Sequence, residues 1–367
     1  MGNVHRTFLT ACWLGLWLSN AASASGSDTA CLRDKGWDKG CITALYAVPR
    51  QAWPRPTIDA GVTWQELAPL PPVPSSPPLR VALGEKLFGD PRLSRSNTIS
   101  CASCHQADKG FSNGQAVAVG HDEAHGTRNA PSLWNLDGAK ALFWDGRAAT
   151  LEIQALGPLA NPVEMAMPLD RLPVKLEKIT EYRRDFAAAY GPGPITLAKL
   201  SNAIATYERT LRSPGTRFDR YLAGERNALS EEEVLGLHLF RTKARCLNCH
   251  QGARMTDNGF HNLGLTYFAR KFEDLGRYEV TGRKEDVGRF KTPGLRGVSH
   301  SGPWMHNGLF PQLTGILNMY NGGMPSPTPS DAIQAANPLF PVKSPLLKPL
   351  SLSREELDAL LAFLLIL

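Results

Sequence analysis

Beyond its first residues the sequence lacks any apolar run of roughly 18 residues, the length needed to cross a membrane. Cysteine is scarce, with seven in 367 residues, which excludes a small scaffold held together by disulfides. Basic residues exceed acidic ones, 40 against 34, but they are scattered, so a nucleic-acid-binding protein is not indicated. With 43% hydrophobic residues, the chain is long enough for two packed domains.

The N-terminus has the pattern of a secretory signal. Arg6 precedes the apolar run FLTACWLGLWL, and the small residues Ala22-Ser23-Ala24 follow. A charged start, a short apolar run and a small-x-small site are typical of a cleaved signal peptide. We therefore expect residues 1–24 to be removed and the protein to be exported, which in a bacterium with an outer membrane means the periplasm.

Six cysteines remain after that cleavage. Cys31 and Cys41 lie close together near the new N-terminus, and an oxidising compartment favours a disulfide between them. The other four form two motifs, CASCH at 101–105 and CLNCH at 246–250.

These motifs lie at matching places in an internal repeat. Gly84-x-x-Leu87-Phe88 precedes the first and Gly236-x-x-Leu239-Phe240 precedes the second. Downstream, Phe143-Trp144-Asp145-Gly146 matches Met305-His306-Asn307-Gly308, and Leu151 matches Leu313. The repeat predicts a duplicated domain rather than an array of short units.

Cys-x-x-Cys-His is the attachment signature of c-type haem. Two thiols on one helical turn bond the vinyl groups of one haem, and the following histidine ligates its iron. We therefore expect two haems, held by Cys101, Cys104 and His105 and by Cys246, Cys249 and His250. A zinc site built from the four cysteines is the competing hypothesis, but it leaves both histidines unexplained.

The fold is expected to be mainly α, with two cytochrome c-like domains and long irregular loops. Capping boxes at Ser230/Glu233 and Ser353/Glu356 open helices, and the apolar spacing of 196–211 predicts another. The proline-rich composition of residues 68–78 predicts an extended segment that leads into the first haem domain. The predicted map is a signal at 1–24, an extension at 25–78, and haem domains at 79–225 and 226–367.

Longer segments resemble the bacterial dihaem cytochrome c peroxidase/MauG family from about residue 79 to the end. The resemblance rests on LGEKLFGDPRLS, RNAPSLWN (128–135), FWDGRAATLEIQALGPLANPVEM (143–165), FKTPGLRGV (290–298), PWMHNG (303–308) and NMYNGG (318–323). It implies a periplasmic enzyme that reduces hydrogen peroxide or uses it to oxidise a partner protein.

The repeat distinguishes the two haems. Pro158 lies as far beyond Gly146 as Tyr320 lies beyond Gly308. Proline offers iron no donor atom and tyrosine does, so the first haem should be open and the second ligated by His250 and Tyr320. Met319 is the alternative ligand, and a packed core aromatic is the alternative role of Tyr320. In the family that the sequence resembles, peroxidases usually carry methionine at the position that matches Tyr320, and MauG-type enzymes carry tyrosine there.

Whereas Tyr320 favours a MauG-type enzyme, His121 favours a peroxidase. A histidine at that spacing before Asn129 blocks the first haem of many resting peroxidases in the family, and MauG-type members typically lack it. His125 is close enough in the sequence to take that role. For both histidines, the alternative is that the side chain is solvated in a loop and does not ligate iron. The sequence thus combines features of both subclasses.

The resemblance also implies the residues that act on peroxide. Glu164 in NPVEM matches the catalytic glutamate and Gln154 its supporting amide; a carboxyl group in an apolar pocket has a raised pKa that suits proton transfer. Trp144 matches the tryptophan between the haems. Asn129, Ser301 and Pro303 match positions that bind calcium, although the family usually has threonine where Ser301 stands.

The sequence therefore predicts a periplasmic dihaem peroxidase. Its partners would be hydrogen peroxide and a small electron donor, a cytochrome c or cupredoxin; its assembly is open, with a homodimer among the options. The alternatives are a MauG-type enzyme acting on a protein substrate and a non-enzymatic electron-transfer cytochrome with both irons closed. Pro158 argues against the last.

Overall fold

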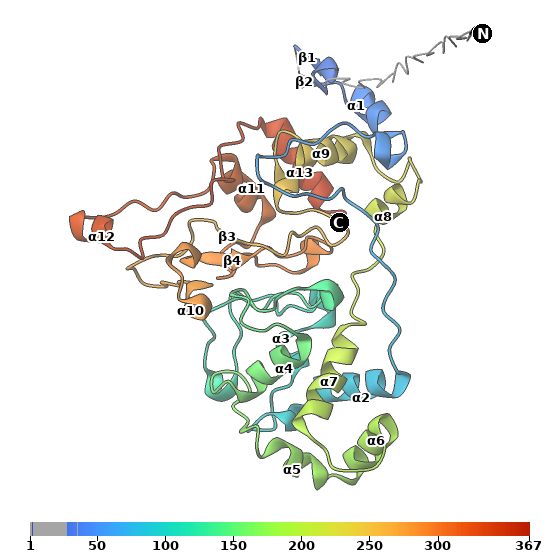
Figure 1. The fold of residues 1–367 in the computed structure, drawn as a ribbon, viewed down its shortest axis with the longest axis vertical. Helices are drawn as coiled ribbons and strands as arrows, with labels where there is room; N and C mark the ends of the chain where they lie inside the picture. The colour runs from blue at the N-terminus through green and yellow to red at the C-terminus, as the bar shows by residue number, and fades with distance from the viewer. Residues whose placement is uncertain (1, 3–27, 35) are drawn as a thin grey trace.

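The computed structural model describes residues 2, 28–34 and 36–367, so the predicted signal peptide, apart from Gly2, lies outside the described residues. Two lobes are stacked along the long axis of the molecule (Figure 1). The first lobe contains α2 to α7, and the second contains α8 to α13 with the N-terminal segment. Among the described residues, no helix is both long enough and apolar enough to span a membrane.

The first lobe is helical with one long irregular stretch between α3 and α4. Proline near the start of α2 and the Thr150 and Thr196 caps of α4 and α7 fix where those helices begin. Its core contains Leu87 and Leu200. Its helices are α2 (Pro78–Gly89), α3 (Cys101–Cys104), α4 (Leu151–Ala160), α5 (Leu172–Glu177), α6 (Thr180–Tyr190) and α7 (Leu197–Glu208).

The second lobe adds a small antiparallel sheet, β3 (Phe260–Asn262) with β4 (Arg289–Lys291), in which His261 pairs with Phe290. Both predicted capping boxes, Ser230/Glu233 and Ser353/Glu356, are confirmed. The helices are α8 (Arg217–Leu222), α9 (Glu231–Arg241), α10 (Tyr278–Thr281), α11 (Leu313–Asn321), α12 (Ala332–Ala336) and α13 (Arg354–Leu364).

Single 3-10 turns punctuate the loops of the chain. They are η1 (Asp28–Cys31), η2 (Arg50–Ala52), η3 (Pro91–Leu93), η4 (Ala107–Lys109), η5 (His121–Glu123), η6 (Leu136–Gly138), η7 (Cys246–Asn248), η8 (Lys284–Asp286) and η9 (Val298–His300).

Each lobe has one close helix crossing. In the first, α2 packs on α7, and a Cβ on Gly84 would lie 2.0 Å from the carbonyl oxygen of Ala203. In the second, α9 packs on α13, and a Cβ on Gly236 would lie 2.1 Å from the carbonyl oxygen of Ala359. Glycine is required at both positions because any side chain would overlap the facing backbone. These two glycines belong to the repeat noted in the sequence.

The N-terminal segment packs on the second lobe, not the first to which the chain continues. It contains β1 (Leu32–Arg33), β2 (Gly36–Trp37) and α1 (Lys39–Tyr46), and the predicted disulfide between Cys31 and Cys41 is confirmed. Tyr46 is fully buried against α9, where Arg241 donates to its hydroxyl at 2.7 Å. The proline-rich segment then runs between the lobes to α2 (Figure 1).

The connection between the lobes lies before α8. This helix precedes the boundary predicted at 225/226, yet Phe218 and Tyr221 are buried in the core of the second lobe.

Candidate functional site

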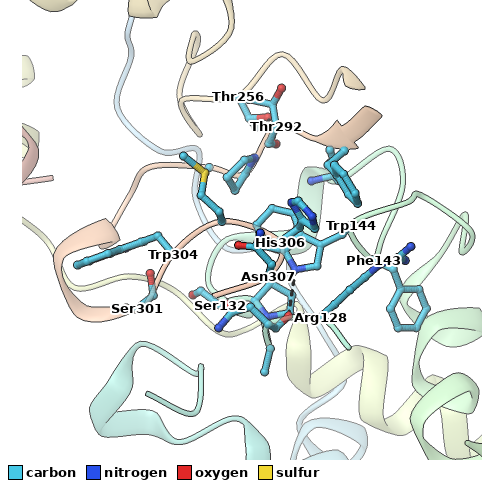
Figure 2. Close-up of a pocket in the computed structure, with 18 of the residues that line it drawn as sticks. Arg128, Ser132, Phe143, Trp144, Thr256, Thr292, Ser301, Trp304, His306 and Asn307 are labelled. Atoms are coloured by element: carbon cyan, nitrogen blue, oxygen red, sulfur yellow. Dashed lines mark hydrogen bonds between the residues drawn. The ribbon is translucent and has the colours of Figure 1, made fainter. Parts of the chain in front are cut away.

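One cavity of about 1350 Å³ extends through both lobes and is lined by both Cys-x-x-Cys-His motifs. Its volume exceeds the roughly 300–1,000 Å³ of a pocket for one small ligand. Most of its wall is apolar. Figure 2 shows Trp144 and His306 among the residues that line it where loops of both lobes approach each other.

The two motif histidines have the same orientation. Nδ1 of His105 donates to the carbonyl oxygen of Phe111 at 2.8 Å, and Nδ1 of His250 donates to that of Met255 at 3.2 Å. Burial lowers the pKa of both rings, which favours the neutral form. A neutral imidazole whose Nδ1–H is bonded keeps the lone pair of Nε2 for a metal.

The four motif cysteines are free thiols that border the cavity. Cys101 and Cys104 lie on α3, and Cys246 begins η7, so each pair lies on one turn. Burial is the main cause that raises the pKa of Cys101 and Cys246 to about 12. These thiols, with the oriented histidines and the large apolar cavity, form a donor set that fits two covalent haems.

Cys249 also lies in a cluster with Asp257 and His261. Nε2 of His261 is 2.8 Å from Oδ2 of Asp257 and 3.7 Å from Sγ of Cys249. Since a haem thioether would use the Cys249 sulfur, the cluster does not argue for a separate metal.

The segments predicted to lie opposite the histidines adopt matching conformations. Isolated bridges join Leu142 to Ala148 and Trp304 to Phe310 at equivalent places in the two lobes. Pro158 on α4 and Tyr320 on α11 both line the cavity, whereas Met319 does not. Burial, and then the nearby Cys249 and Cys246, raise the pKa of Tyr320.

Glu164 and Gln154 line the first-lobe part of the same cavity. Asn161 donates to Oε1 of Glu164 at 2.9 Å. Burial raises the pKa of Glu164, while Asn161 and Arg147 act in the opposite direction. Oε1 of Gln154 is buried without a hydrogen-bond partner in the described structure. This wall therefore carries a carboxyl group whose pKa is raised and an amide oxygen that can accept a hydrogen bond.

Asn129 joins the two loops that face each other across the lobes. Trp144 donates its indole N–H to the carbonyl oxygen of Asn129 at 3.0 Å, and the backbone N–H of Asn129 donates to the carbonyl of His306 at 2.7 Å. His306 stacks on Phe290 with ring centroids 3.6 Å apart, and burial lowers its pKa to about 4. Trp144 is thereby held where the two lobes meet.

A partly buried group of ion pairs joins the two lobes at the same place. Arg128 of the first lobe contacts Asp145 at 2.5 Å and Asp274 of the second lobe at 2.7 Å, and it also reaches Glu279 at 3.0 Å. Asp145 follows Trp144 directly, so the loop that carries the tryptophan is tied to the second lobe.

His121 and His125 differ in position. His125 lines the cavity and His121 does not. The backbone N–H of His121 donates to the carbonyl of Glu164 at 2.8 Å, and its ring lies 3.4 Å from Asp122. Ligation of iron by His121 stays a prediction.

The residues predicted for calcium all border the cavity. The amide nitrogen of Asn129 donates to the carbonyls of Gln115 and Ala116, so its amide oxygen is the atom a cation would use. Ser301 donates to the carbonyl of Val298 at 3.4 Å, and the peptide bond before Pro303 is cis. Calcium binding also stays a prediction.

Four residues of this site were not found by sequence reasoning. Asn161 stands three residues before Glu164, a spacing that could have suggested their contact. Arg128 and Lys291 lie in segments that carry the family resemblance, and Glu208 borders the cavity without belonging to any recognised motif.

Fold and site together define a protein built to hold two c-type haems. Residues 78–227 match the family described as di-haem cytochrome c peroxidase. Cytochrome c551 peroxidase of Nitrosomonas europaea is 37% identical over 62% of this chain and 68% of its own length. Methylamine utilization protein MauG of Methylorubrum extorquens is 37% identical over 84% of this chain and 87% of its own.

Solved structures agree with this assignment. A MauG-like protein associated with microbial copper homeostasis is 30% identical, with a TM-score of 0.70 over 84% of this chain and 95% of that one. A variant of the diheme peroxidase BthA from Burkholderia thailandensis is 26% identical, with a TM-score of 0.69 over 84% of this chain and 90% of that one. The chain belongs to the di-haem cytochrome c peroxidase family, a family of oxidoreductases, and membership implies two c-type haems.

Proposed function

We propose that the protein is a dihaem c-type peroxidase that reduces hydrogen peroxide to water with two electrons and two protons. The observation that carries the proposal is the composition of the first-lobe cavity wall. Glu164, Gln154 and Pro158 border it together with His105, and the proline side chain has no donor atom that could ligate iron. Peroxidase names among the relatives support the same activity.

Cys101, Cys104 and His105 would hold the first haem, and Cys246, Cys249, His250 and Tyr320 the second. When bound, haem iron supplies the redox chemistry of O–O cleavage. Glu164 accepts a proton from the peroxide and returns it to the departing oxygen. Its raised pKa brings the carboxyl group closer to the pH at which a group both accepts and donates protons well. Gln154 accepts a hydrogen bond from peroxide and orients it.

Electrons would enter the second lobe from a small redox protein and reach the first by way of Trp144. Its contacts with both lobes support this role.

We further propose that the chain is exported to the periplasm, that the lobes arose by duplication, and that Asn129, Ser301 and Pro303 bind calcium between them. The matching glycine crossings support the duplication.

The second candidate is a MauG-type enzyme that uses peroxide to oxidise a partner protein. Two observations favour it: Tyr320 borders the cavity, and His121 does not. A tyrosine oxygen ligand would stabilise higher oxidation states of the second haem more than methionine would. Peroxide reacts at the first lobe in both candidates, so the same residues act on it.

Electron paramagnetic resonance with optical spectra of the ferric protein, before and after one equivalent of peroxide, separates the candidates. A low-spin first haem that becomes high-spin only after partial reduction supports the peroxidase. A high-spin first haem at rest, with a long-lived near-infrared band after peroxide, supports the MauG-type enzyme. Two low-spin haems that are inert to peroxide in the oxidised and half-reduced states would contradict both.

A further inference from the structure

The two helix crossings place α7 and α13 in the same register. Gly84 faces the carbonyl of Ala203 and Cβ of Tyr207, and Gly236 faces the carbonyl of Ala359 and Cβ of Phe363. The residues that follow these contacts therefore occupy equivalent positions. Ile204 and Leu360 form one such pair, and both line the cavity.

Four residues further along each helix the lobes differ. The first lobe has Glu208 and the second has Leu364, and both side chains line the cavity. The carboxyl group thus occupies a position that the second lobe fills with an apolar side chain. A buried carboxyl with no structural partner destabilises a fold, so its presence calls for a function.

Glu208 lies in an apolar setting beside the first haem motif. It is 4% exposed, and its Oε2 atom is buried without a hydrogen-bond partner in the described structure. Burial raises its pKa to about 8. After burial, the charge of Glu208 is the next cause that raises the pKa of Cys101, so the carboxyl lies close to the thiol that would bond the haem.

The charged neighbours do not neutralise it. Arg209 lowers the pKa of Glu208, but its guanidinium is bonded to Glu152 at 2.8 Å, and Glu152 raises the pKa. Charged and titratable groups on the elements packed around this end of α7 are Glu85 of α2, Cys101 and Cys104 of α3, Glu152 of α4, Tyr207 of α7, Arg209 at the C-cap of α7, and Glu164 beyond α4.

We propose that Glu208 is a redox-linked proton site of the first lobe, binding one proton when that lobe gains an electron. The electron would come from the external donor and reduce the haem that Cys101, Cys104 and His105 would hold. The proton comes from water and binds the carboxylate of Glu208. The added negative charge disfavours the nearby carboxylate, and in a site of low polarity this coupling is strong. Proton uptake during reduction would then place a proton in the lobe where peroxide is reduced.

The inference rests on haem attachment to the first motif and is the same for either candidate activity. Haem content, measured by mass spectrometry of the intact protein, tests attachment separately. The reduction potential of each haem is then followed by spectroelectrochemical titration from about pH 6 to about pH 9. A tenfold change in proton concentration corresponds to 59 mV for a one-electron couple. We expect the first haem of the wild type to show a pH-dependent potential with a slope up to about that value.

Glu208→Gln and Glu208→Leu should remove that slope, and Glu208→Leu installs the residue that the second lobe carries. Glu85→Gln removes an exposed carboxyl on the packed helix α2 and should keep the slope. Leu364→Glu should create a slope at the second haem. The reduced-minus-oxidised infrared spectrum of the wild type should show a protonated carboxyl band that Glu208→Gln removes.

Two results would overturn the proposal. One is a first-haem potential that does not change with pH in the wild type. The other is a pH slope and carboxyl band retained by a folded, fully haem-loaded Glu208→Gln or Glu208→Leu protein. If both variants fail to fold, the wild-type potential and infrared spectrum still decide, because a first haem without a pH slope or without the band contradicts proton uptake by a carboxyl.

Discussion

Asn161 donates a hydrogen bond to Oε1 of Glu164 over 2.9 Å, and both residues border the cavity beside the first haem motif. The bond fixes one carboxyl oxygen and leaves the other free for proton transfer. It also opposes burial, which raises the pKa of Glu164. The contact thus controls both the orientation and the protonation of the residue on which the proposed chemistry depends.

Replacing Glu164 with glutamine should slow the reaction with peroxide by about 10²–10⁴-fold, because general acid–base catalysis contributes that much. The measurement is the stopped-flow rate of the first-haem spectral change as peroxide is varied. Glu181→Gln, which removes an exposed carboxyl on α6, serves as the control and should react as the wild type does. An unchanged rate in Glu164→Gln would remove the residue from the mechanism.

Replacing Asn161 with alanine should move the pH profile of the same reaction to higher pH. Asn161 lowers the pKa of Glu164, so its loss raises that pKa further. The proton-accepting carboxylate then forms only at higher pH. Relative to the wild type, the rate should therefore fall most on the acidic side of the pH profile and least at alkaline pH. A uniform loss at every pH would show that Asn161 acts through structure alone.

Tyr320→Phe should convert the second haem from six-coordinate to five-coordinate, which electron paramagnetic resonance detects as a change from low to high spin. Met319→Leu should leave that haem unchanged, since Met319 does not line the cavity. Tyr320→Met should raise the potential of the second haem, as methionine ligation does in cytochromes c. If Met319→Leu alters the spin state and Tyr320→Phe does not, the ligand assignment is reversed.

Gly84→Ala should lower the free energy of unfolding by about 1–3 kcal/mol, the usual effect of overpacking. Its new methyl group would lie 2.0 Å from the carbonyl oxygen of Ala203, a backbone atom that cannot move aside easily. Gly89→Ala on the same helix is the matched control, because nothing lies within 4 Å of its Cβ position. Thermal unfolding followed by circular dichroism compares the two; equal stabilities would contradict the tight crossing.

Arg128→Gln should lower the free energy of unfolding by up to about 3 kcal/mol, because Asp274 loses its cation and Asp145 keeps only Arg147. Since these carboxylates belong to different lobes, calorimetry should also resolve the lobes into more separate transitions. Arg184→Gln, at an exposed arginine paired with Asp185, should change stability by no more than about 0.5 kcal/mol.

Much of the architecture follows from local sequence. The helices opened by Ser230 and Ser353 begin where their side chains can bond the first free N–H groups, a rule that needs no tertiary contact. The two Cys-x-x-Cys-His motifs predict haem attachment because they place three donors within five residues, on one turn. The repeat predicted the pairing of Pro158 with Tyr320, and the structure places Pro158 on α4 and Tyr320 on α11.

Other features depend on segments far apart in the chain. The N-terminal segment packs on α9 because Tyr46 finds Arg241 there, a choice no local pattern encodes. The backbone N–H of Lys291 meets the carbonyl of Trp144, and Arg128 meets Asp274, only once the lobes have come together. Glu208 would pass in the sequence as an ordinary carboxyl at the end of a helix. Its side chain is buried in the cavity wall, where the second lobe has the apolar Leu364. Tertiary packing decides this burial, because the polarity around a side chain is set by all its neighbours in space.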